Sequence, residues 1–295
     1  MVATILDGKK ISAAIREELK RKVDHLKEAG IAPCLAGILI GENPGSTTYF
    51  KLKAKACEDI GIRESMHRLP DSATEDELLE TIGTLNKDTK VHGIFIQLPL
   101  PKHLSENTAL AAILPEKDVD GMNAVNVGKA WLGQAAYLPG AASAIQEMLV
   151  RSGHDPENKD VVIVNIDNLV GKPLASILIQ DKEKARANVT LCSPTTPDLV
   201  AYTRRADILV VSVNKPRFIT ADMIKSGAVV IDFGTNLVTD TVTQKRKAVG
   251  DVDFEAIKDK AGAISPVPGG VGPMLITMLM LNTVMAASKA ARLPV

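Results

Sequence analysis

The chain has 295 residues, of which 45% are apolar and 24% charged. This length and composition are typical of a soluble globular protein with one large or two modest domains and a sizeable buried core. Because 35 basic residues balance 35 acidic ones, the charge points neither to nucleic acid nor to an anionic membrane as a partner. A small-molecule ligand is therefore the better expectation.

The cysteines and the N-terminal residues indicate in which cellular compartment the protein is expected. Cys34, Cys57 and Cys192 are odd in number and far apart, which favours reduced thiols in an intracellular protein over disulfides or a zinc site. The five histidines form no pair with ligand spacing, so no metal is expected. The start lacks a basic region followed by a long apolar one, and no apolar run approaches the ~18 residues of a membrane span. We expect a cytoplasmic protein, with an organelle after removal of a leader left open.

Helical and extended patterns alternate in the first half of the chain. Apolar side chains recur at helical spacing from residue 9, Gly30 can cap that helix, and Ser46 can begin another. In chain order the expected elements are helix 9–30, strand 34–40, helix 46–61, strand 63–69, helix 74–86 and strand 92–98. Such alternation predicts a parallel sheet that is covered on both faces.

The alternation restarts after a Gly/Ala-rich passage at residues 133–142. The expected elements are strand 161–166, a helix from Gly171, strand 188–191, a helix ending at Arg205, strand 207–213, a helix from Thr220 and strand 229–233. A last apolar helix, 274–287, is expected to pack against the first domain. We predict two α/β three-layer domains with mostly parallel sheets, the second Rossmann-like: residues 1–145 plus 274–295, and residues 146–273.

Four segments carry groups suited to chemistry. Residues 264–273 combine three prolines with glycines in a preformed loop that suits a flat ligand, or simply connects to the last helix. Tyr49 and Lys53 are four apart, so they share one helix face, as many surface pairs do. Gln97 ends an apolar strand at the sheet edge where ligands gather, although neighbouring backbone can also satisfy it. Asp118 and Asp120 with Gly121 fit an Asx-type turn.

These segments resemble those of the methylenetetrahydrofolate dehydrogenase/methenyltetrahydrofolate cyclohydrolases. The resemblance covers nearly the whole chain and rests on residues 46–53, 93–101 and 117–121, and on the closing loop with Asn282 and Thr283 behind it. It implies a folate cleft between the two domains and a homodimer paired through the second. It also implies that Lys53 is the main catalytic group, with Tyr49 and Gln97 beside it, and that the substrate-binding residues are Asp120, Tyr49, Gln97, Pro268, Gly269, Gly270 and Pro273.

The implied hydrolysis needs one group that moves a proton twice. Water attacks the carbon of the methenyl cation, and a proton must then reach one nitrogen so that the ring opens to 10-formyltetrahydrofolate. Lys53 can accept and return that proton if burial lowers its pKa from ~10.4 toward neutrality. For Asp120, the two carboxylate oxygens can accept adjacent N–H donors of a pterin in one plane.

The second domain departs from the family where the nucleotide is expected. The family turn reads Gly-Arg-Ser, and its arginine and a later serine hold the 2′-phosphate of NADP; here the turn reads Asn165, Ile166 and Asp167, and Pro194 replaces the serine. Losing the arginine costs ~1.5–3 kcal/mol, and a facing aspartate adds ~1 kcal/mol. NAD has no 2′-phosphate, so its binding would lose less free energy than the binding of NADP. The candidate cofactor-binding residues are Asn165, Ile166, Asp167, Val170, Gly171, Pro194, Thr196, Asn214 and Gly234.

Three hypotheses follow. The first is a folate one-carbon enzyme that hydrolyses 5,10-methenyltetrahydrofolate and whose NADP-dependent methylenetetrahydrofolate dehydrogenase step is impaired or lost. The second is the fully bifunctional dehydrogenase/cyclohydrolase, which uses NAD or NADP. The third is a non-catalytic folate-binding regulatory protein, against which the presence of Lys53 counts. The changed turn is also consistent with a cleft that binds some other nucleotide.

Overall fold

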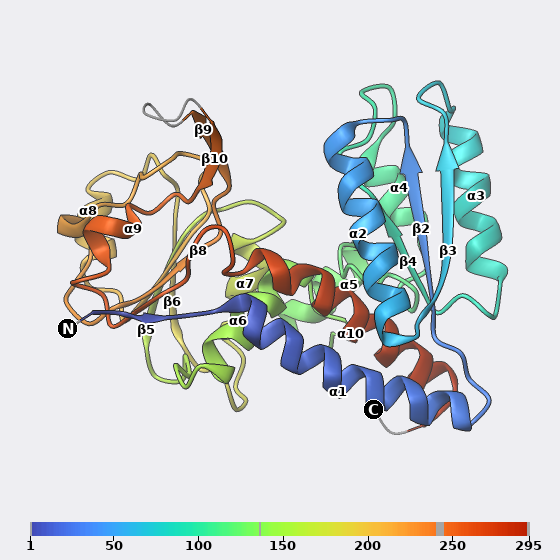
Figure 1. Cartoon of the computed structure of the whole chain (residues 1–295), viewed down its shortest axis with the longest axis horizontal. Coiled ribbons are helices and arrows are strands. Elements are labelled where there is room, and N and C mark those ends of the chain that lie inside the picture. Colours follow the sequence, from blue (N-terminus) through green and yellow to red (C-terminus); the bar gives the residue numbers. More distant parts are fainter. Residues whose placement is uncertain (1, 136, 240–244, 294–295) are drawn as a thin grey trace. The chain divides into compact units, whose positions relative to one another are not determined.

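The structure is a computed structural model that describes residues 2–135, 137–239 and 245–293. It divides into two compact units (Figure 1). The first unit comprises Ala13–Gly140 and Ile276–Val295, and the second comprises Met1–Ser12 and Ala141–Leu275. Helices α1 (Gly8–Glu28) and α10 (Gly272–Ala290) therefore each contribute residues to both units. The domain boundaries expected from the sequence, after residues 145 and 273, stay a prediction.

In its described part, the first unit is built on a three-stranded parallel sheet in the order β3–β2–β4. The strands are β2 (Cys34–Ile40), β3 (Arg63–Leu69) and β4 (Gly93–Ile96). Every residue of the central strand β2 is buried, which explains its uninterrupted apolar sequence. All three strands were predicted. Strand β4 ends one residue before Gln97, whose backbone N–H still donates to Ile38 O at 2.9 Å.

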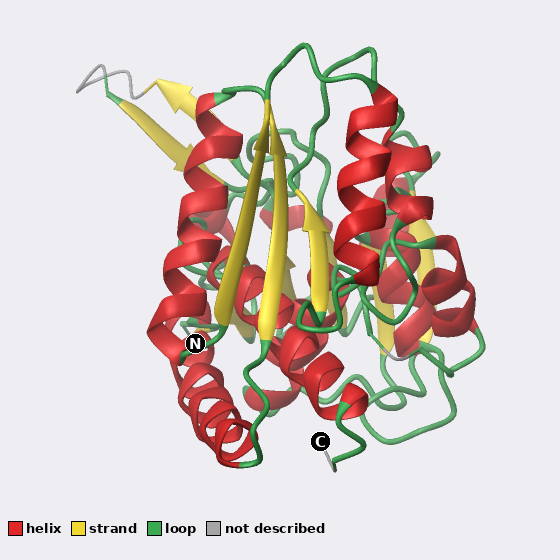
Figure 2. Ribbon diagram, turned by 90° about the vertical axis from the view of Figure 1, so that its right-hand side faces the viewer, coloured by secondary structure: helices red, strands yellow, loops and turns green. Residues whose placement is uncertain are grey.

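Helices cover both faces of this sheet (Figures 1 and 2). On one face, α3 (Glu75–Lys87) and α4 (Glu106–Ala112) pack over Ala36, Ile38 and Ile40. On the other face lies α2 (Pro44–Ile60), where the rings of Phe50 and Phe95 are 5.7 Å apart. The helix α5 (Ala124–Trp131) follows α4 along the chain, and α6 (Gly140–Arg151) leads into the second unit.

The start of α2 differs from the prediction that Ser46 caps it. Asn43 is the N-cap, and its Oδ1 accepts the Ser46 backbone N–H at 3.1 Å. Pro44 supplies the first helical residue, because its fixed φ suits a helix and its missing N–H is not needed there. The predicted C-terminus is confirmed, since Gly61 caps the helix in the left-handed conformation with φ 78°.

Most residues of helix α10 belong to the first unit. Its Asn282 donates from Nδ2 to Val119 O at 2.8 Å and to Leu138 O at 3.0 Å. Among the described residues, α10 is the one helix long and apolar enough to cross a membrane, with a mean hydropathy of 1.2. Because 67% of that apolar stretch is buried inside the protein, its composition is that of a core helix.

Within the described residues, the second unit holds a six-stranded parallel sheet in the order β1–β11–β8–β7–β5–β6. Its strands are β1 (Thr4–Ile5), β5 (Asp160–Val164), β6 (Asn188–Cys192), β7 (Ile208–Val211), β8 (Val229–Asp232) and β11 (Ala263–Ile264). The order β6–β5–β7–β8 is Rossmann-like. The predicted fold class is confirmed. The sequence reasoning missed β1 and β11, which are only two residues long.

The connections of the second unit are short. Its helices are α7 (Gly171–Leu178), α8 (Leu199–Thr203) and α9 (Phe254–Ile257). The helix predicted from Thr220 is wrong: only the 3₁₀ turn Ala221–Met223 forms, because Ile224 is extended and Gly227 has φ 80°. An antiparallel pair that was not predicted, β9 (Asn236–Thr239) and β10 (Arg246–Val249), follows β8.

We expect Gly37→Ala to destabilise the protein by about 1–3 kcal/mol, because a Cβ there would lie 2.6 Å from the Phe95 ring and 2.7 Å from Met66 Sδ. Urea unfolding measures this change. The matched control is Gly83→Ala in α3, where a Cβ meets no described atom within 4 Å and the unfolding free energy should rise by about 0.5–1 kcal/mol. Equal effects at both positions would contradict the close packing of Phe95 on β2.

Candidate active site

Lys53 and Gln97 meet at the rim of the sheet in the first unit. Lys53 projects from α2, and its half-buried Nζ donates to Gln97 Oε1 at 3.2 Å. The same ammonium lies 4.1 Å from the centroid of the Phe95 ring. Gln97 Nε2 donates to Leu98 O at 3.0 Å, so the amide oxygen is fixed toward the amine. The predicted placement of Gln97 beside Lys53 is thus observed, while the catalytic roles of both residues stay predictions.

Burial dominates the electrostatics of Lys53. Loss of solvent lowers the pKa of the amine, while the nearby Asp120 carboxylate acts in the opposite direction. Burial also raises the pKa of the half-buried Asp120, and Lys53 opposes this shift. The amine and the carboxylate therefore influence each other within one partly desolvated site. A lowered pKa makes an amine a better candidate for a group that releases and regains a proton during a reaction.

Asp118 and Asp120 lie in the loop between α4 and α5 and differ in role. Asp118 is buried and accepts hydrogen bonds from Asn123 N and Asn126 Nδ2, both at 2.8 Å. Burial raises the pKa of Asp118, and these donors oppose the shift. Gly121 turns the loop with φ 68° and donates from its N–H to Asp118 O. Asp118 thus holds the loop that places Asp120 near Lys53.

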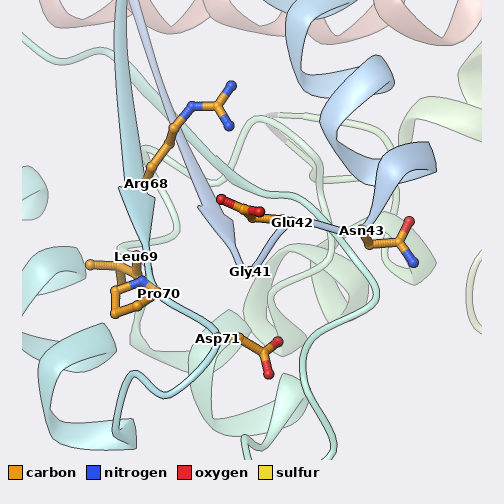
Figure 3. A pocket seen from close by; sticks show the side chains of 7 residues that line it. All are labelled: Gly41, Glu42, Asn43, Arg68, Leu69, Pro70 and Asp71. Atoms are coloured by element: carbon orange, nitrogen blue, oxygen red, sulfur yellow. The ribbon is translucent and has the colours of Figure 1, made fainter.

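Tyr49 lies one turn before Lys53 on α2 and is 48% exposed. The predicted shared face follows from this spacing, and its role beside Lys53 stays a prediction. A separate cavity of about 700 Å³ opens at the carboxyl ends of β2 and β3 (Figure 3). It is lined by Gly41, Glu42, Asn43, Arg68, Leu69, Pro70 and Asp71, none of which the sequence singled out.

The closing loop lies in the second unit and has a fixed backbone. The Val267–Pro268 peptide is cis, Gly269 has φ 111°, and the N–H of Gly270 donates to Pro266 O at 2.8 Å. Gly8 N donates to Gly269 O at 3.0 Å, so the chain start braces the loop. These contacts account for the glycines and prolines of the loop, so the presence of these residues does not require a bound ligand. Folate binding by Pro268, Gly269, Gly270 and Pro273 stays a prediction.

The turn between β5 and α7 is built by its own side chains. Asn165 is 7% exposed and donates from Nδ2 to Ser212 O at 2.7 Å and to Asp167 Oδ2 at 2.8 Å. Its Oδ1 accepts from Gly171 N at 2.8 Å. Asp167 Oδ1 accepts from Leu169 N and Val170 N, the two residues that directly precede α7. The Asn165 side chain therefore faces the protein interior.

The remaining predicted cofactor residues also lie in loops of the second unit. Thr196 Oγ1 accepts from Ser193 N at 2.9 Å, next to Pro194. Asn214 has φ 54°, and its N–H donates to the buried Asp251 at 3.0 Å. Gly234 is required, because a Cβ there would lie 2.1 Å from Asp251 Cγ. These residues follow β6, β7 and β8 at the carboxyl edge of the sheet, where nucleotides bind in such folds.

The described residues offer no candidate metal-binding site. Among them, no group of three or more His, Cys, Asp or Glu side chains is placed to hold an ion. Cys34, Cys57 and Cys192 are buried free thiols in the described structure. Burial raises the pKa of the Cys57 thiol to about 12, so it remains protonated beside Lys53.

A Rossmann-like sheet is typical of nucleotide-binding α/β enzymes, and a half-buried amine with a lowered pKa, as in the first unit, is typical of a catalytic site. Residues 6–120 match the family described as tetrahydrofolate dehydrogenase/cyclohydrolase, catalytic domain, and residues 139–291 match its NAD(P)-binding domain. The chain belongs to the tetrahydrofolate dehydrogenase/cyclohydrolase family. It is an enzyme of one-carbon folate metabolism with a C-terminal NAD(P)-binding domain.

Relatives match over their full length. The chain is 52% identical to the bifunctional protein FolD of Dehalococcoides mccartyi, covering 99% of both proteins. It is 49% identical to that of Syntrophus aciditrophicus, covering 99% of this chain and 100% of the relative. The crystal structure of the FolD enzyme from Campylobacter jejuni has 45% identity and a TM-score of 0.92 over 97% of this chain and 99% of that one. FolD from Trypanosoma brucei, complexed with NADP and inhibitor, has 36% identity and a TM-score of 0.91, with 99% of each chain covered.

The leading hypothesis from the sequence, that the dehydrogenase step is impaired or lost, is wrong. Relatives about half identical over the whole chain are named bifunctional, which favours the second hypothesis instead. The structure supplies a physical reason. Asn165 stands where the family has a glycine, and its side chain is buried and completes the turn. The third hypothesis, a non-catalytic protein, is set aside because the chain belongs to an enzyme family.

We expect Asp120→Asn to lower the pKa of Lys53 further, because the Asp120 carboxylate raises it in the native protein. The pH dependence of Lys53 labelling by acetic anhydride, followed by mass spectrometry, measures this pKa. Lys55 serves as the internal control, since its pKa is raised by Asp59 and Glu58 rather than by Asp120. An unchanged or higher pKa for Lys53 would contradict the proposed pairing.

Proposed function

We propose that the chain is a bifunctional enzyme that oxidises 5,10-methylenetetrahydrofolate with a nicotinamide nucleotide and hydrolyses the resulting 5,10-methenyltetrahydrofolate to 10-formyltetrahydrofolate. The observation that carries the proposal is the Lys53 amine, half-buried and held by Gln97 at 3.2 Å. The NAD(P)-binding domain supports the oxidative half. When bound, the nucleotide would supply the acceptor for the hydride that leaves the methylene carbon.

The hydrolysis needs a proton acceptor and donor at one place. Water adds to the methenyl carbon while its proton passes to the free amine of Lys53. The carbon–N5 bond then breaks as the C=O bond of the formyl group forms on N10. The Lys53 ammonium gives its proton to N5, and the proton of the added hydroxyl group is released to solvent. Gln97 orients the amine through its Oε1. Asp120 is the expected partner of the pterin N–H donors, because its carboxylate lies on the loop next to Lys53.

The residues of the second unit fit a dinucleotide more readily without a 2′-phosphate. The turn after β5 presents Ile166, which is 50% exposed, and the exposed carboxylate of Asp167. Neither supplies a positive charge to a phosphate, and the carboxylate repels one. We therefore propose that the dehydrogenase uses NAD in preference to NADP. A homodimer and a cytoplasmic location, expected from the resemblance and the sequence, belong to the same proposal.

Lys53→Met should lower the hydrolysis rate by about 10²–10⁴-fold, because the reaction loses its acid–base group. Decay of methenyltetrahydrofolate absorbance measures the rate, and circular dichroism should show an unchanged fold. The matched control is Lys51→Met, an exposed lysine on the same helix, which should retain wild-type activity. Native hydrolysis by Lys53→Met would refute the assignment.

The double variant Ile166→Arg with Asp167→Ser should shift the ratio of kcat/KM values from NAD toward NADP by about tenfold to a thousandfold. The gained arginine attracts a 2′-phosphate, and the lost carboxylate no longer repels it. Hydrolysis by the same variant should be unchanged and controls for folding. If the wild-type enzyme already uses NADP more efficiently than NAD, the proposed preference fails while the bifunctional assignment stands.

A further inference from the structure

The Lys53 amine lies against an aromatic ring that takes no part in the proposed proton transfer. Its Nζ is 4.1 Å from the centroid of the Phe95 ring. Phe95 belongs to β4 and is completely buried. An ammonium over a ring face is attracted by the negative charge density of that face, and the attraction is larger where water is excluded. The ring therefore acts on the charged form of the amine.

Phe95 and Gln97 approach the amine together. They are two residues apart along an extended chain, so their side chains share one face of the sheet. The backbone N–H of Gln97 still pairs with Ile38 O at 2.9 Å. The Gln97 amide oxygen accepts one N–H of Lys53 at 3.2 Å, and the ring covers a second side of the nitrogen. Because an ammonium has three N–H donors, its remaining side is left for water or a substrate.

The packing around Phe95 fixes the ring independently of the amine. The Phe50 ring of α2 lies 5.7 Å from it, at an interplanar angle of 51°. A Cβ on Gly37 of β2 would come within 2.6 Å of the Phe95 ring, so only glycine leaves room for it. The Arg68 guanidinium lies over the Phe50 ring, 5.5 Å from its centroid. Lys53 and Arg68 thus contact different rings of this aromatic pair.

In the described structure, titratable groups reach the amine from two elements. From the loop after α4, Asp120 raises the pKa of Lys53, while burial lowers it more strongly. Helix α2 carries Tyr49 one turn before Lys53 and Cys57 one turn after it. Burial raises the pKa of the Cys57 thiol to about 12, so the thiol stays neutral. The Phe95 ring does not titrate, so its effect on the amine is the same at every pH.

We propose that Phe95 is a positioning residue for Lys53: the ring holds the amine beside Gln97 and favours its protonated form where the site contains little water. Asp120 also favours that form, but its carboxylate is the expected partner of the pterin N–H donors in the complex. The ring then remains to stabilise the ammonium until N5 takes the proton. This consequence for catalysis rests on the proposed hydrolysis, whereas the contact between ring and amine does not.

Replacing Phe95 with phenylalanine that carries one, two or three ring fluorines tests the inference. Each fluorine withdraws electron density from the ring face, while the ring keeps nearly the same shape. The pH dependence of Lys53 labelling by acetic anhydride, followed by mass spectrometry, should have a midpoint that falls stepwise with the number of fluorines. With three fluorines, the ratio of neutral to protonated amine at a fixed pH should be roughly threefold to tenfold higher than in the wild type.

The matched control is the same fluorinated series at Phe50, the other ring of the pair. That ring faces Arg68, so the labelling midpoint of Lys53 should stay at its wild-type value. Urea unfolding verifies that every variant folds. A midpoint that stays constant along the series at Phe95, or that falls equally for both positions, would overturn the inference.

The pH dependence of methenyltetrahydrofolate hydrolysis separates this inference from the proposed function. If Lys53 is the acid–base group, the acidic limb of kcat/KM should follow the labelling midpoint to lower pH along the series at Phe95. A labelling midpoint that falls while the hydrolysis profile stays fixed would support the role of Phe95 and contradict that of Lys53 in hydrolysis.

Discussion

The candidate active site depends on one constraint: the Lys53 amine is held at the rim of the first unit's sheet, where water cannot fully hydrate it. An ammonium is strongly hydrated, and burial favours its neutral form unless a carboxylate pairs with it. Here, the Lys53 Nζ contacts an amide oxygen and the face of Phe95, and Asp120 is near enough to raise its pKa again. The amide and the ring stabilise the cation weakly. Burial therefore lowers the pKa of the amine, and the Asp120 carboxylate limits this shift.

The need to hold the Lys53 amine in this position explains several otherwise separate features of the first unit. Gly37 has no side chain because the Phe95 ring occupies the space above it, and this ring supports the amine. Asp118 uses its carboxylate on the loop backbone and on Asn126, which leaves Asp120 for Lys53. Two acids two residues apart therefore have different tasks, one in holding the loop and one in the site.

The sequence predicted the order and type of most elements, because those depend on local patterns: apolar runs, helical spacing and strand ends. The nearness of Gln97 to Lys53 was expected from the family resemblance instead. It did not predict the consequence of Asn165, because whether an asparagine at a turn projects outward or folds inward depends on Ser212 O, 47 residues further along the chain. Strands β1 and β11 were missed for a related reason, since two residues carry no pattern and their pairing is set by distant neighbours. Resemblance to a family, rather than periodicity, supplied the substrate.

The path of the chain between the units has a consequence for synthesis. The first unit is assembled from two separated stretches, and its second stretch is the C-terminal end that carries α10. When residue 140 leaves the ribosome, Val119 O and Leu138 O still lack the Asn282 amide that satisfies them in the finished protein. The second unit, by contrast, has all its strands once residue 264 has emerged. Nascent chains should therefore complete the nucleotide-binding half first, and a fragment ending near residue 140 should expose apolar surface that α10 covers in the whole protein.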